Sequence, residues 1–308
     1  MIKINKIKWL RFASALLLLS YIIPVKKHEC AEKQTLIVLT FDDGYSCWLS
    51  TVMPILARYG LPATAFINDP DCVHDKTSPE ITWNDIRELH HAGWEIGWHT
   101  AEHIKVTAAN LSELSEDFRH SQDLFKAHGL PSPVTFAYPR GRHDCASMAA
   151  ASRFFLAARA IHAGVNPPHY VQKHSADLVA INLGNAFPFT NAKEVVDKWR
   201  NRGVLIIFAA HTVEQIADWQ SQPDMNAKEF QQFAEFLSDG RKKGDFNVVT
   251  LKEGVRLMTQ RQVTSSWSIG PFSHIDWHLT HHGFAVPQRC FDWYQTINRF
   301  RQHHWPKG

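Results

Sequence analysis

Acidic side chains follow a short apolar run near residue 40 of this 308-residue chain, at the point where the run ends. Leu36–Phe41 leads directly into Asp42, Asp43 and Gly44. Asp-Asp-Gly is most often a tight turn, because these residue types favour turns. Two adjacent carboxylates, however, need a bound cation or a shared proton to offset their repulsion. The pair is therefore a candidate site for metal binding or for proton transfer.

Two histidines come directly after another short apolar run. Trp94–Trp98 ends in His99, and His103 follows four residues later. Histidines spaced i and i+4 can bind one metal ion. The chain contains 19 histidines, so this spacing alone does not define a site. Together with Asp43 the two histidines make three ligands, which leaves coordination positions open and is typical of catalytic zinc.

Two further runs end in residues of chemical interest. Val204–Ala210 is followed by His211, which is a candidate general acid if it lies near the carboxylates. Val134–Tyr138 leads into the turn Pro139–Gly141. Such a turn can present a backbone N–H to a site, although a plain strand-ending turn explains it equally well.

The elements that position these residues alternate between short strands and helices. One segment expected to be helical begins near Thr82 and ends at Gly93. Three others cover Leu111–His128, Asn191–Asn201 and Ala227–Gly240. The segments expected to be strands are β-branched or aromatic and too short for helices. They are Leu36–Thr40, Ala63–Ile67, Trp94–Trp98, Val134–Tyr138, Phe154–Ala158, Leu178–Asn182, Val204–Ala209 and Phe246–Thr250.

Strand–helix alternation predicts parallel strands joined by helical crossovers. About eight such units favour an α/β barrel over an open doubly wound sheet. In barrels the chemistry lies on the loops after the strands, where all four motifs are found. We expect this barrel to occupy residues 32–260, with an N-terminal hydrophobic segment at residues 1–31 and a C-terminal extension at residues 261–308.

The four motifs, in this order, resemble the polysaccharide deacetylases of the NodB-homology type, carbohydrate esterase family 4. The similarity covers about residues 35–255 and includes the patterns at Thr82–Leu89, Gly93–Gly97 and Val248–Leu251. The resemblance implies a distorted (β/α) barrel of seven to eight parallel strands. It also implies the divalent-metal-dependent removal of acetyl groups from N-acetylated sugars.

The resemblance assigns roles residue by residue. Asp42 is similar to the catalytic base of the family, and Asp43, His99 and His103 are similar to its metal ligands. A bound metal lowers the pKa of its water and polarises the amide carbonyl. This ligand set suits zinc and would also accept cobalt or nickel.

Two other roles follow from the later motifs. His211 matches the general acid, which must protonate the sugar nitrogen because an amine anion is a very poor leaving group. The backbone N–H of Arg140 matches the group that stabilises the oxyanion.

The chain departs from the family at two places. Many members have an arginine two residues before the proline of the third motif, where it orients the catalytic aspartate; this chain has Ala137. We hypothesise that Arg159, at the end of the next strand, supplies the missing cation. The family motif that builds a wall of the site has no clear counterpart in Leu178–Phe187.

The two ends of the chain differ in composition from the barrel. Lys3, Lys6, Lys8 and Arg11 precede the apolar run Phe12–Val25, which is the arrangement of a secretory signal or an uncleaved membrane anchor. Either one predicts an extracytoplasmic protein. Residues 261–308 are rich in Trp and His and are expected to pack on the barrel, or to form a sugar-stacking surface.

Composition limits the class of partner. The formal net charge is only +3 and no dense basic stripe is present, so nucleic acid is not an expected partner. The five cysteines show no CxxC spacing, which disfavours a cysteine-based zinc site. We expect an N-acetylated glycan as substrate. Two alternatives stay open, namely a hydrolase of another non-peptide C–N amide and a non-catalytic glycan-binding relic.

Overall fold

The computed structural model describes residues 33–72, 81–184, 189–214 and 225–261. The predicted signal or anchor at residues 1–31 and all but the first residue of the predicted extension lie outside the described residues. None of the described helices is both long and apolar enough to cross a membrane.

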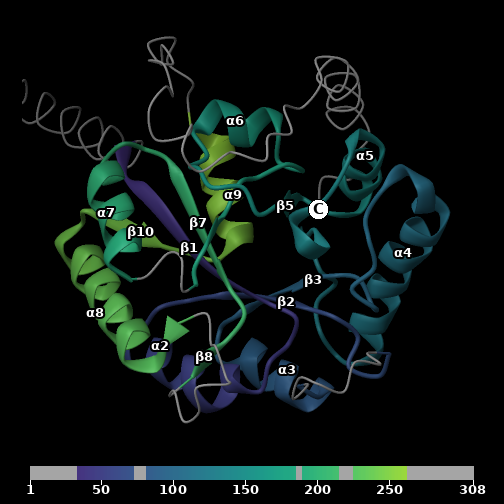
Figure 1. Ribbon diagram of the computed structural model, residues 1–308, viewed down its shortest axis with the longest axis horizontal. Helices are drawn as coiled ribbons and strands as arrows, with labels where there is room; N and C mark the ends of the chain where they lie inside the picture. The colour runs from purple at the N-terminus through teal and green to yellow at the C-terminus, as the bar shows by residue number, and fades with distance from the viewer. Residues whose placement is uncertain (1–32, 73–80, 185–188, 215–224, 262–308) are drawn as a thin grey trace, which may run out of the picture.

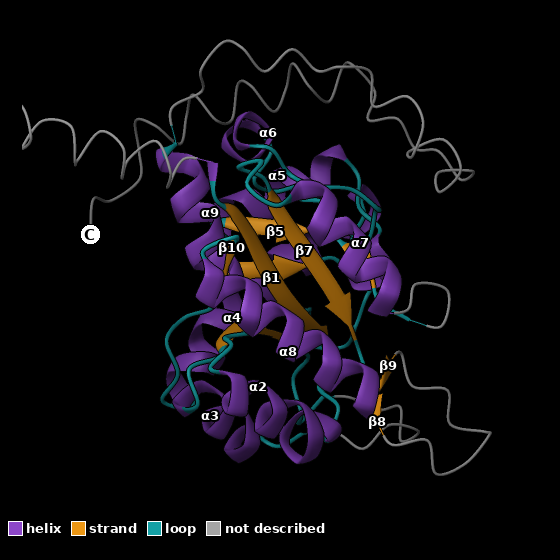
Figure 2. Cartoon of the chain, turned by 90° about the vertical axis from the view of Figure 1, so that its left-hand side faces the viewer, coloured by secondary structure: helices purple, strands orange, loops and turns teal. Residues whose placement is uncertain are grey.

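One parallel sheet forms the centre of the molecule and the helices lie around it (Figures 1 and 2). The strand order is β5-β4-β3-β2-β1-β7-β6, and β10 pairs with β1 outside this path. The strands are β1 (Thr35–Asp42), β2 (Thr64–Ile67), β3 (Glu95–Trp98), β4 (Thr135–Ala137), β5 (Ala157–Arg159), β6 (Ile181–Asn182), β7 (Leu205–Ala210) and β10 (Phe246–Val248). Each of the eight predicted strands is present, and the α/β fold with a curled parallel sheet is confirmed.

The sheet curls because its outer strands approach each other through one extended segment. Leu178 forms a parallel bridge with Arg159 of β5, and Ile181 and Asn182 pair with β7. On the other side of the sheet, β10 and β2 both pair with β1. β10 pairs with its first residues and β2 with its last. The result is a distorted barrel.

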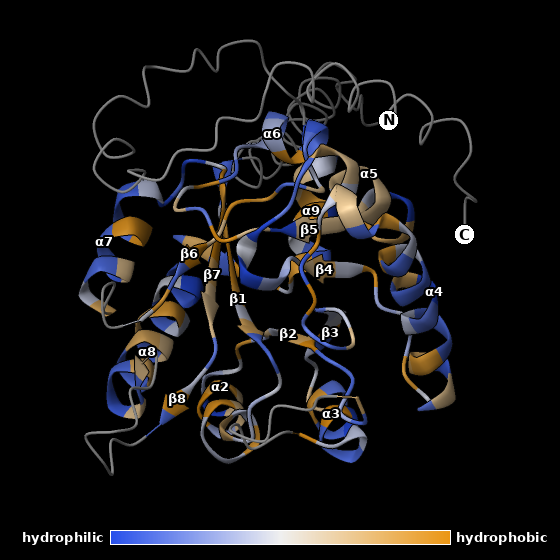
Figure 3. Ribbon diagram, turned by 45° about the vertical axis from the view of Figure 1, so that its right-hand side comes forward, coloured by the Kyte–Doolittle hydropathy of each residue, from blue (hydrophilic) through white to orange (hydrophobic). Residues whose placement is uncertain are grey.

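Helices cover the outside of the sheet and carry hydrophilic residues on their outer faces (Figure 3). They are α2 (Met53–Tyr59), α3 (Trp83–His91), α4 (Leu111–Ala127), α5 (Cys145–Phe154), α6 (Pro168–Lys173), α7 (Phe189–Trp199), α8 (Ala227–Lys243) and α9 (Leu251–Gln260). A π-helical turn, η1 (Trp48–Val52), precedes α2, and the short strands β8 (Val213–Glu214) and β9 (Met225–Asn226) pair with each other.

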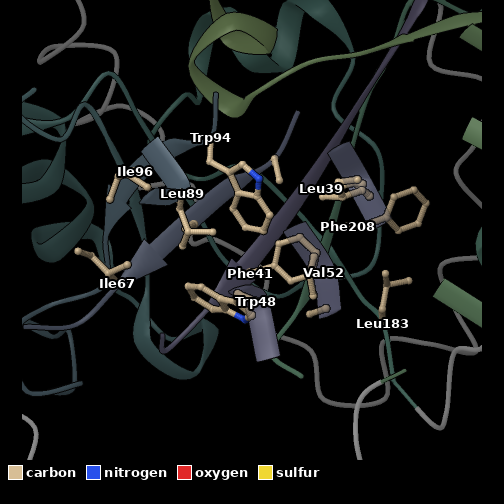
Figure 4. Packing of buried hydrophobic residues seen from close by; sticks show 14 of the residues in the cluster. Leu39, Phe41, Trp48, Val52, Ile67, Leu89, Trp94, Ile96, Leu183 and Phe208 are labelled. Atoms are coloured by element: carbon tan, nitrogen blue, oxygen red, sulfur yellow. The ribbon is translucent and has the colours of Figure 1, made fainter. Parts of the chain in front are cut away.

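Side chains alternate between the two faces of each strand, and this separates two apolar clusters. Ile37, Leu39 and Phe41 of β1 pack under the outer helices, where Phe41 lies between Trp48 and Trp94 (Figure 4). Leu36 and Val38 belong to the second cluster, on the inner face of the sheet, with residues of α9. Asp42 has the same parity as Leu36 and Val38, so its side chain points to the inner face.

Helix boundaries agree with the sequence at one helix and disagree at another. Thr82 and Asp85 form the predicted capping box of α3. The predicted end of a helix at Gly240 is wrong, because α8 continues to Lys243 and ends at Gly244 in the left-handed conformation. A Cβ at residue 240 would overlap the ring of Phe246, so this glycine is needed for close packing instead.

Candidate active site

The carboxyl ends of the central strands meet at one end of the barrel. Asp42 ends β1, while His99, Pro139 and His211 follow β3, β4 and β7 within two residues. Because these strands are parallel, the loops that follow them share the same edge of the sheet. The four sequence motifs are therefore brought together.

Asp43, His99 and His103 form a candidate metal centre. Oδ1 of Asp43 lies 3.2 Å from Nε2 of His99 and 3.6 Å from Nε2 of His103. One ligand atom from each of the three residues lies within 4.8 Å of the other two. In the part of the chain that the structure describes, no other group of three such residues meets this criterion.

The hydrogen bonds around these side chains fit a divalent cation. Nδ1 of His99 lies 2.8 Å from the carbonyl oxygen of Ala137, to which it donates, so Nε2 keeps a lone pair for a metal. Oδ1 of Asp43 is buried and has no hydrogen-bond partner. A buried oxygen without a partner is costly, and a cation between it and the two imidazoles would satisfy it.

The protonation states also suit metal binding. Burial acts to raise the pKa of Asp43, but the adjacent imidazole of His99, and then the charges of His211 and His103, hold this pKa well below its usual value. Burial, followed by the charge of His99, lowers the pKa of His103. A carboxylate that stays ionised and an imidazole that stays neutral are the forms that bind metals.

A partly buried carboxylate on α4 holds the loop between the two histidines. Asp117 accepts hydrogen bonds of 2.7 Å from Nε1 of Trp98 and from the backbone N–H of Ala101. On the other side Nδ2 of Asn68 donates to the carbonyl oxygens of His99 and Thr100. Neither Asp117 nor Asn68 was predicted, because a single polar residue in a helix or after a strand carries no pattern of its own.

Asp42 lies inside the barrel in contact with Arg159. Both side chains are almost completely buried, and Nη2 of Arg159 donates to Oδ1 of Asp42. The guanidinium also packs over the ring of Phe66, 5.0 Å from its centroid. Arg159 thus lies where the hypothesis about the missing cation requires it, and its role in turnover stays a prediction.

Strand register explains why the arginine can come from β5. Ala137 of β4 and Arg159 of β5 are partners in the sheet, and both lie on the inner face. The small side chain of Ala137 leaves room beside it. A guanidinium from residue 159 therefore reaches the space that a longer side chain at residue 137 would fill.

His211 lies near the second carboxylate oxygen of Asp43, Oδ2, whereas the two ligand histidines lie near Oδ1. Its Nε2 lies 3.9 Å from Oδ2 of Asp43, and a third of its side chain is exposed. Nε1 of Trp48 donates a 2.7 Å hydrogen bond to the backbone carbonyl oxygen of His211, which fixes the start of this loop. An exposed imidazole at this distance can transfer a proton to a bound ligand.

The backbone at this end of the barrel is strained. Five described residues other than glycine have positive φ angles, and four of them are Asp43, Thr100, His103 and Arg140. Conformations of this kind cost free energy and cluster at functional sites. Arg140, whose backbone N–H is the predicted oxyanion donor, has φ 59° within the Pro139–Gly141 turn.

The structure does not identify the family motif that builds a wall of the site and that was expected within Leu178–Phe187. Leu183 extends β6 by donating its N–H to the carbonyl oxygen of Ala209. The rest of the predicted stretch, residues 185–187, lies outside the described residues.

Comparisons with known proteins match one sequence family and agree with the fold. The sequence model of the polysaccharide deacetylase family matches residues 30–159. This range contains β1 to β5, and therefore every predicted site residue except His211.

One curated relative is the Bacillus subtilis (strain 168) protein "Putative polysaccharide deacetylase YxkH". It is 26% identical over 117 residues, which are 38% of this chain and 41% of the relative. The chain thus spans about two fifths of the length of this relative.

Solved structures show the same fold at low sequence identity. A "putative polysaccharide deacetylase" from Mycobacterium smegmatis aligns with a TM-score of 0.51 at 15% identity, over 76% of this chain and 94% of the other. A mutant of a CE4 family pseudoenzyme with restored enzymatic activity aligns with a TM-score of 0.50 at 12% identity, over 73% of this chain and 68% of the other.

Proposed function

We propose, from the match of residues 30–159 to the polysaccharide deacetylase family, that the protein is a metal-dependent hydrolase acting on carbohydrate. It removes N-acetyl groups from a GlcNAc-containing polysaccharide or oligosaccharide. The observation that carries this proposal is the triad of Asp43, His99 and His103 beside the buried pair of Asp42 and Arg159.

The residues at the barrel mouth divide the work of amide hydrolysis. A divalent metal held by Asp43, His99 and His103 would polarise the acetyl carbonyl and lower the pKa of a water molecule. Asp42, oriented by Arg159, accepts the proton of the attacking water. The backbone N–H of Arg140 then stabilises the negative charge that forms on the acetyl oxygen.

The second half of the reaction needs an acid. His211 is partly exposed at the mouth and close to Asp43, so it can reach the nitrogen of a bound acetamido group. It protonates this nitrogen as the C–N bond breaks, which leaves acetate and a free amino sugar. The aspartate base and the histidine acid thus act from different strands, β1 and β7.

The proposed metal is zinc, since two imidazoles and a carboxylate suit it, and cobalt or nickel would bind the same ligands. An extracytoplasmic location completes the proposal. It follows from the basic and apolar N-terminal sequence at residues 3–25, which would either be removed or hold the enzyme at a membrane.

Acetate release from a panel of acetylated glycans tests the proposal. The wild-type protein should release acetate, and a chelator should abolish the release until zinc is restored. The Asp42→Asn variant should bind zinc normally and lose at least about 100-fold in kcat, because the base is absent. Release that is insensitive to chelator, or full activity of Asp42→Asn, would refute the mechanism. Turnover of small amides alone would instead favour another C–N hydrolase.

A further inference from the structure

The residue that begins the turn after β4 is fixed by contacts to β5 and to the segment between α6 and β6. The N–H of Tyr138 donates to the carbonyl oxygen of Arg159 at 3.0 Å, which continues the pairing of β4 with β5. The hydroxyl of Tyr138 donates to the carbonyl oxygen of Ala176 at 2.8 Å. Ala176 lies just before the extended segment that closes the sheet. One end of the turn is therefore attached to the segment that leads into β6.

The other end of the turn is attached to the same segment by a buried pair of side chains. Nε2 of His143 lies 2.8 Å from Oδ1 of Asp177, and their side chains are only 8% and 10% exposed. Tyr170 of α6 donates its hydroxyl to the backbone oxygen of Asp177 at 2.9 Å and contacts Oδ2 at 3.3 Å. Asp177 is thus held in place from two sides.

The two attachments are also packed against each other. The ring of His143 stacks on the ring of Tyr138, with centroids 4.5 Å apart and planes 19° from parallel. Residues 138 and 143 therefore form one layer that rests on residues 176 and 177. The four residues between them have to follow a closed path between two fixed points.

This path contains two consecutive residues in the left-handed conformation. Arg140 and Gly141 have φ angles of 59° and 64°, and a Cβ on Gly141 would lie 2.7 Å from the backbone nitrogen of Ile161. Such a conformation persists only where the surroundings enforce it. The bonds within the turn, from Gly141 N–H to the Tyr138 oxygen and from Arg142 N–H to the Pro139 oxygen, do not tie it to the barrel.

A buried pair of this kind is a poor source of stability. Removing a charged or polar pair from water costs free energy that its mutual attraction often does not recover. The Nδ1 atom of His143 is also buried without a hydrogen-bond partner, which adds to the cost. The pair therefore has a better explanation in geometry than in net stability.

We propose that His143 and Asp177 are positioning residues that hold the Pro139–Gly141 turn, and through it the backbone N–H of Arg140, in the orientation that stabilises the oxyanion. This inference rests on the proposed deacetylase function. Neither side chain needs to touch the substrate. Both act through the backbone of residues 138–143.

The expected effect is confined to the transition state. A carbonyl oxygen gains its full negative charge only during hydrolysis, so a misplaced N–H weakens the transition state more than the bound substrate. Asp177→Ala and His143→Ala should each lower kcat by roughly 10- to 100-fold while KM changes by less than about threefold. Asp177→Asn keeps an oxygen that faces His143, and it should recover most of the lost kcat.

A control variant separates positioning from general loss of stability. Glu95 is buried at the opposite end of the barrel, where it accepts hydrogen bonds from Thr135 and from the N–H of Lys252. Glu95→Ala should lower the melting temperature as much as Asp177→Ala and should leave kcat nearly unchanged. Equal losses of kcat in the two variants, or a rise in KM alone, would overturn the inference.

Hydrogen exchange provides a readout that does not depend on turnover. The amides of Gly141 and Arg142, which are hydrogen-bonded within the turn, should exchange faster in Asp177→Ala than in the wild type, whereas those of residues 99–104 should not change. If the wild-type protein releases no acetate from any glycan, the proposed function has failed. The positioning claim then stands or falls on exchange at Gly141, whose N–H is bonded to the carbonyl oxygen of Tyr138, and unchanged protection there would refute it.

Discussion

At the scale of single residues, Asp42, the base of the proposed reaction, contacts an arginine that comes from β5. Arg159 and Ala137 are partners in the β4–β5 pairing, and both face the inside of the barrel. An arginine at residue 137 of β4 or at residue 159 of β5 could therefore place its guanidinium at the same point beside Asp42. This geometry leads to a direct exchange experiment.

The arginine should be movable across one strand. Arg159→Ala should lower kcat by about 10- to 100-fold, because the carboxylate of Asp42 loses its contact with the guanidinium and, with it, its orientation. Adding Ala137→Arg in the same chain should restore part of this activity. Steady-state kinetics on the single and double variants measures both effects. Unchanged turnover in Arg159→Ala would show that the contact has no role in catalysis.

The residue that supports the histidine loop should control metal affinity. Asp117 holds both Trp98 and Ala101, so Asp117→Ala frees the backbone between His99 and His103. We expect zinc affinity to fall by about 10- to 100-fold. Competition with a chromophoric chelator measures this change. Asp123→Ala, on the same helix, serves as the control, and an equal loss of affinity there would contradict the expected role.

Residue types at strand ends could be predicted from the sequence, but their supports could not. Asp42, Asp43 and His99 stand where apolar runs stop, so the sequence marks them. The supporting contacts join segments that are distant in the sequence and that only the fold brings together. They are made by Asp117, Asn68, His143 and Asp177. Nothing in their local sequence distinguishes them from ordinary surface residues.

At the scale of elements, α8 shows how a glycine can mislead a boundary prediction. Gly240 resembles a helix end, but it lies within α8 where the ring of Phe246 packs against the helix backbone. The true end is Gly244, at φ 78° and with open space around its Cα. The two glycines serve different physical needs, close approach in one case and a left-handed turn in the other.

Substitution of these two glycines should separate the needs. Gly240→Ala forces Phe246 to move and should destabilise the fold by about 1–3 kcal/mol in spite of the better helix propensity of alanine. Gly244→Ala only strains the backbone and should cost about 1 kcal/mol. Urea unfolding of both variants gives the two values. A larger loss in Gly244→Ala than in Gly240→Ala would contradict this packing.

Short helices were the elements that the sequence did not reveal. The helix α5 consists largely of small residues with weak amphipathic character, and α6 covers only six residues, the first of which is Pro168. The predicted strand Phe154–Ala158 is shifted, because Phe154 ends α5 and β5 begins at Ala157. Tertiary packing decides such boundaries.

At the scale of the whole molecule, a buried carboxylate ties the amino ends of three strands to a helix. Glu95 begins β3 and accepts hydrogen bonds from Thr64 of β2, from Thr135 of β4 and from the first turn of α9 at Lys252. Burial raises the pKa of Glu95 above the ordinary value of 4.5, although these hydrogen bonds oppose the shift. The folded state therefore favours the protonated form.

The raised pKa predicts the sign of a pH effect on stability. The contribution of Glu95 should be fully present below about pH 4.5 and should be lost as the pH rises through the folded pKa. Residue 95 cannot titrate in Glu95→Gln. The stability of the wild type should therefore fall relative to that of this variant as the pH rises above about 4. Urea unfolding across this range, with chelator present to remove metal effects, measures the difference. A difference that is independent of pH would refute the assignment.

Closure of the sheet was predictable only in outline. Strand–helix alternation indicates a parallel barrel, but it does not reveal that β10 pairs with β1 or that Leu178 bridges to β5. The pairing of β10 with β1 joins residues that are more than a hundred positions apart in the sequence. Both contacts depend on strand register, which a single sequence does not encode locally.

The base of the barrel also brings the two ends of the described domain together. The guanidinium of Arg261, just after α9, donates to the carbonyl oxygens of Gln34 at 2.6 Å and Gly203 at 2.7 Å. Gln34 directly precedes β1, so the first and last described elements begin and end at one corner, opposite the candidate active site. A short linker could therefore join them, and the chain could be reopened at an exposed turn as a circular permutant without moving the mouth.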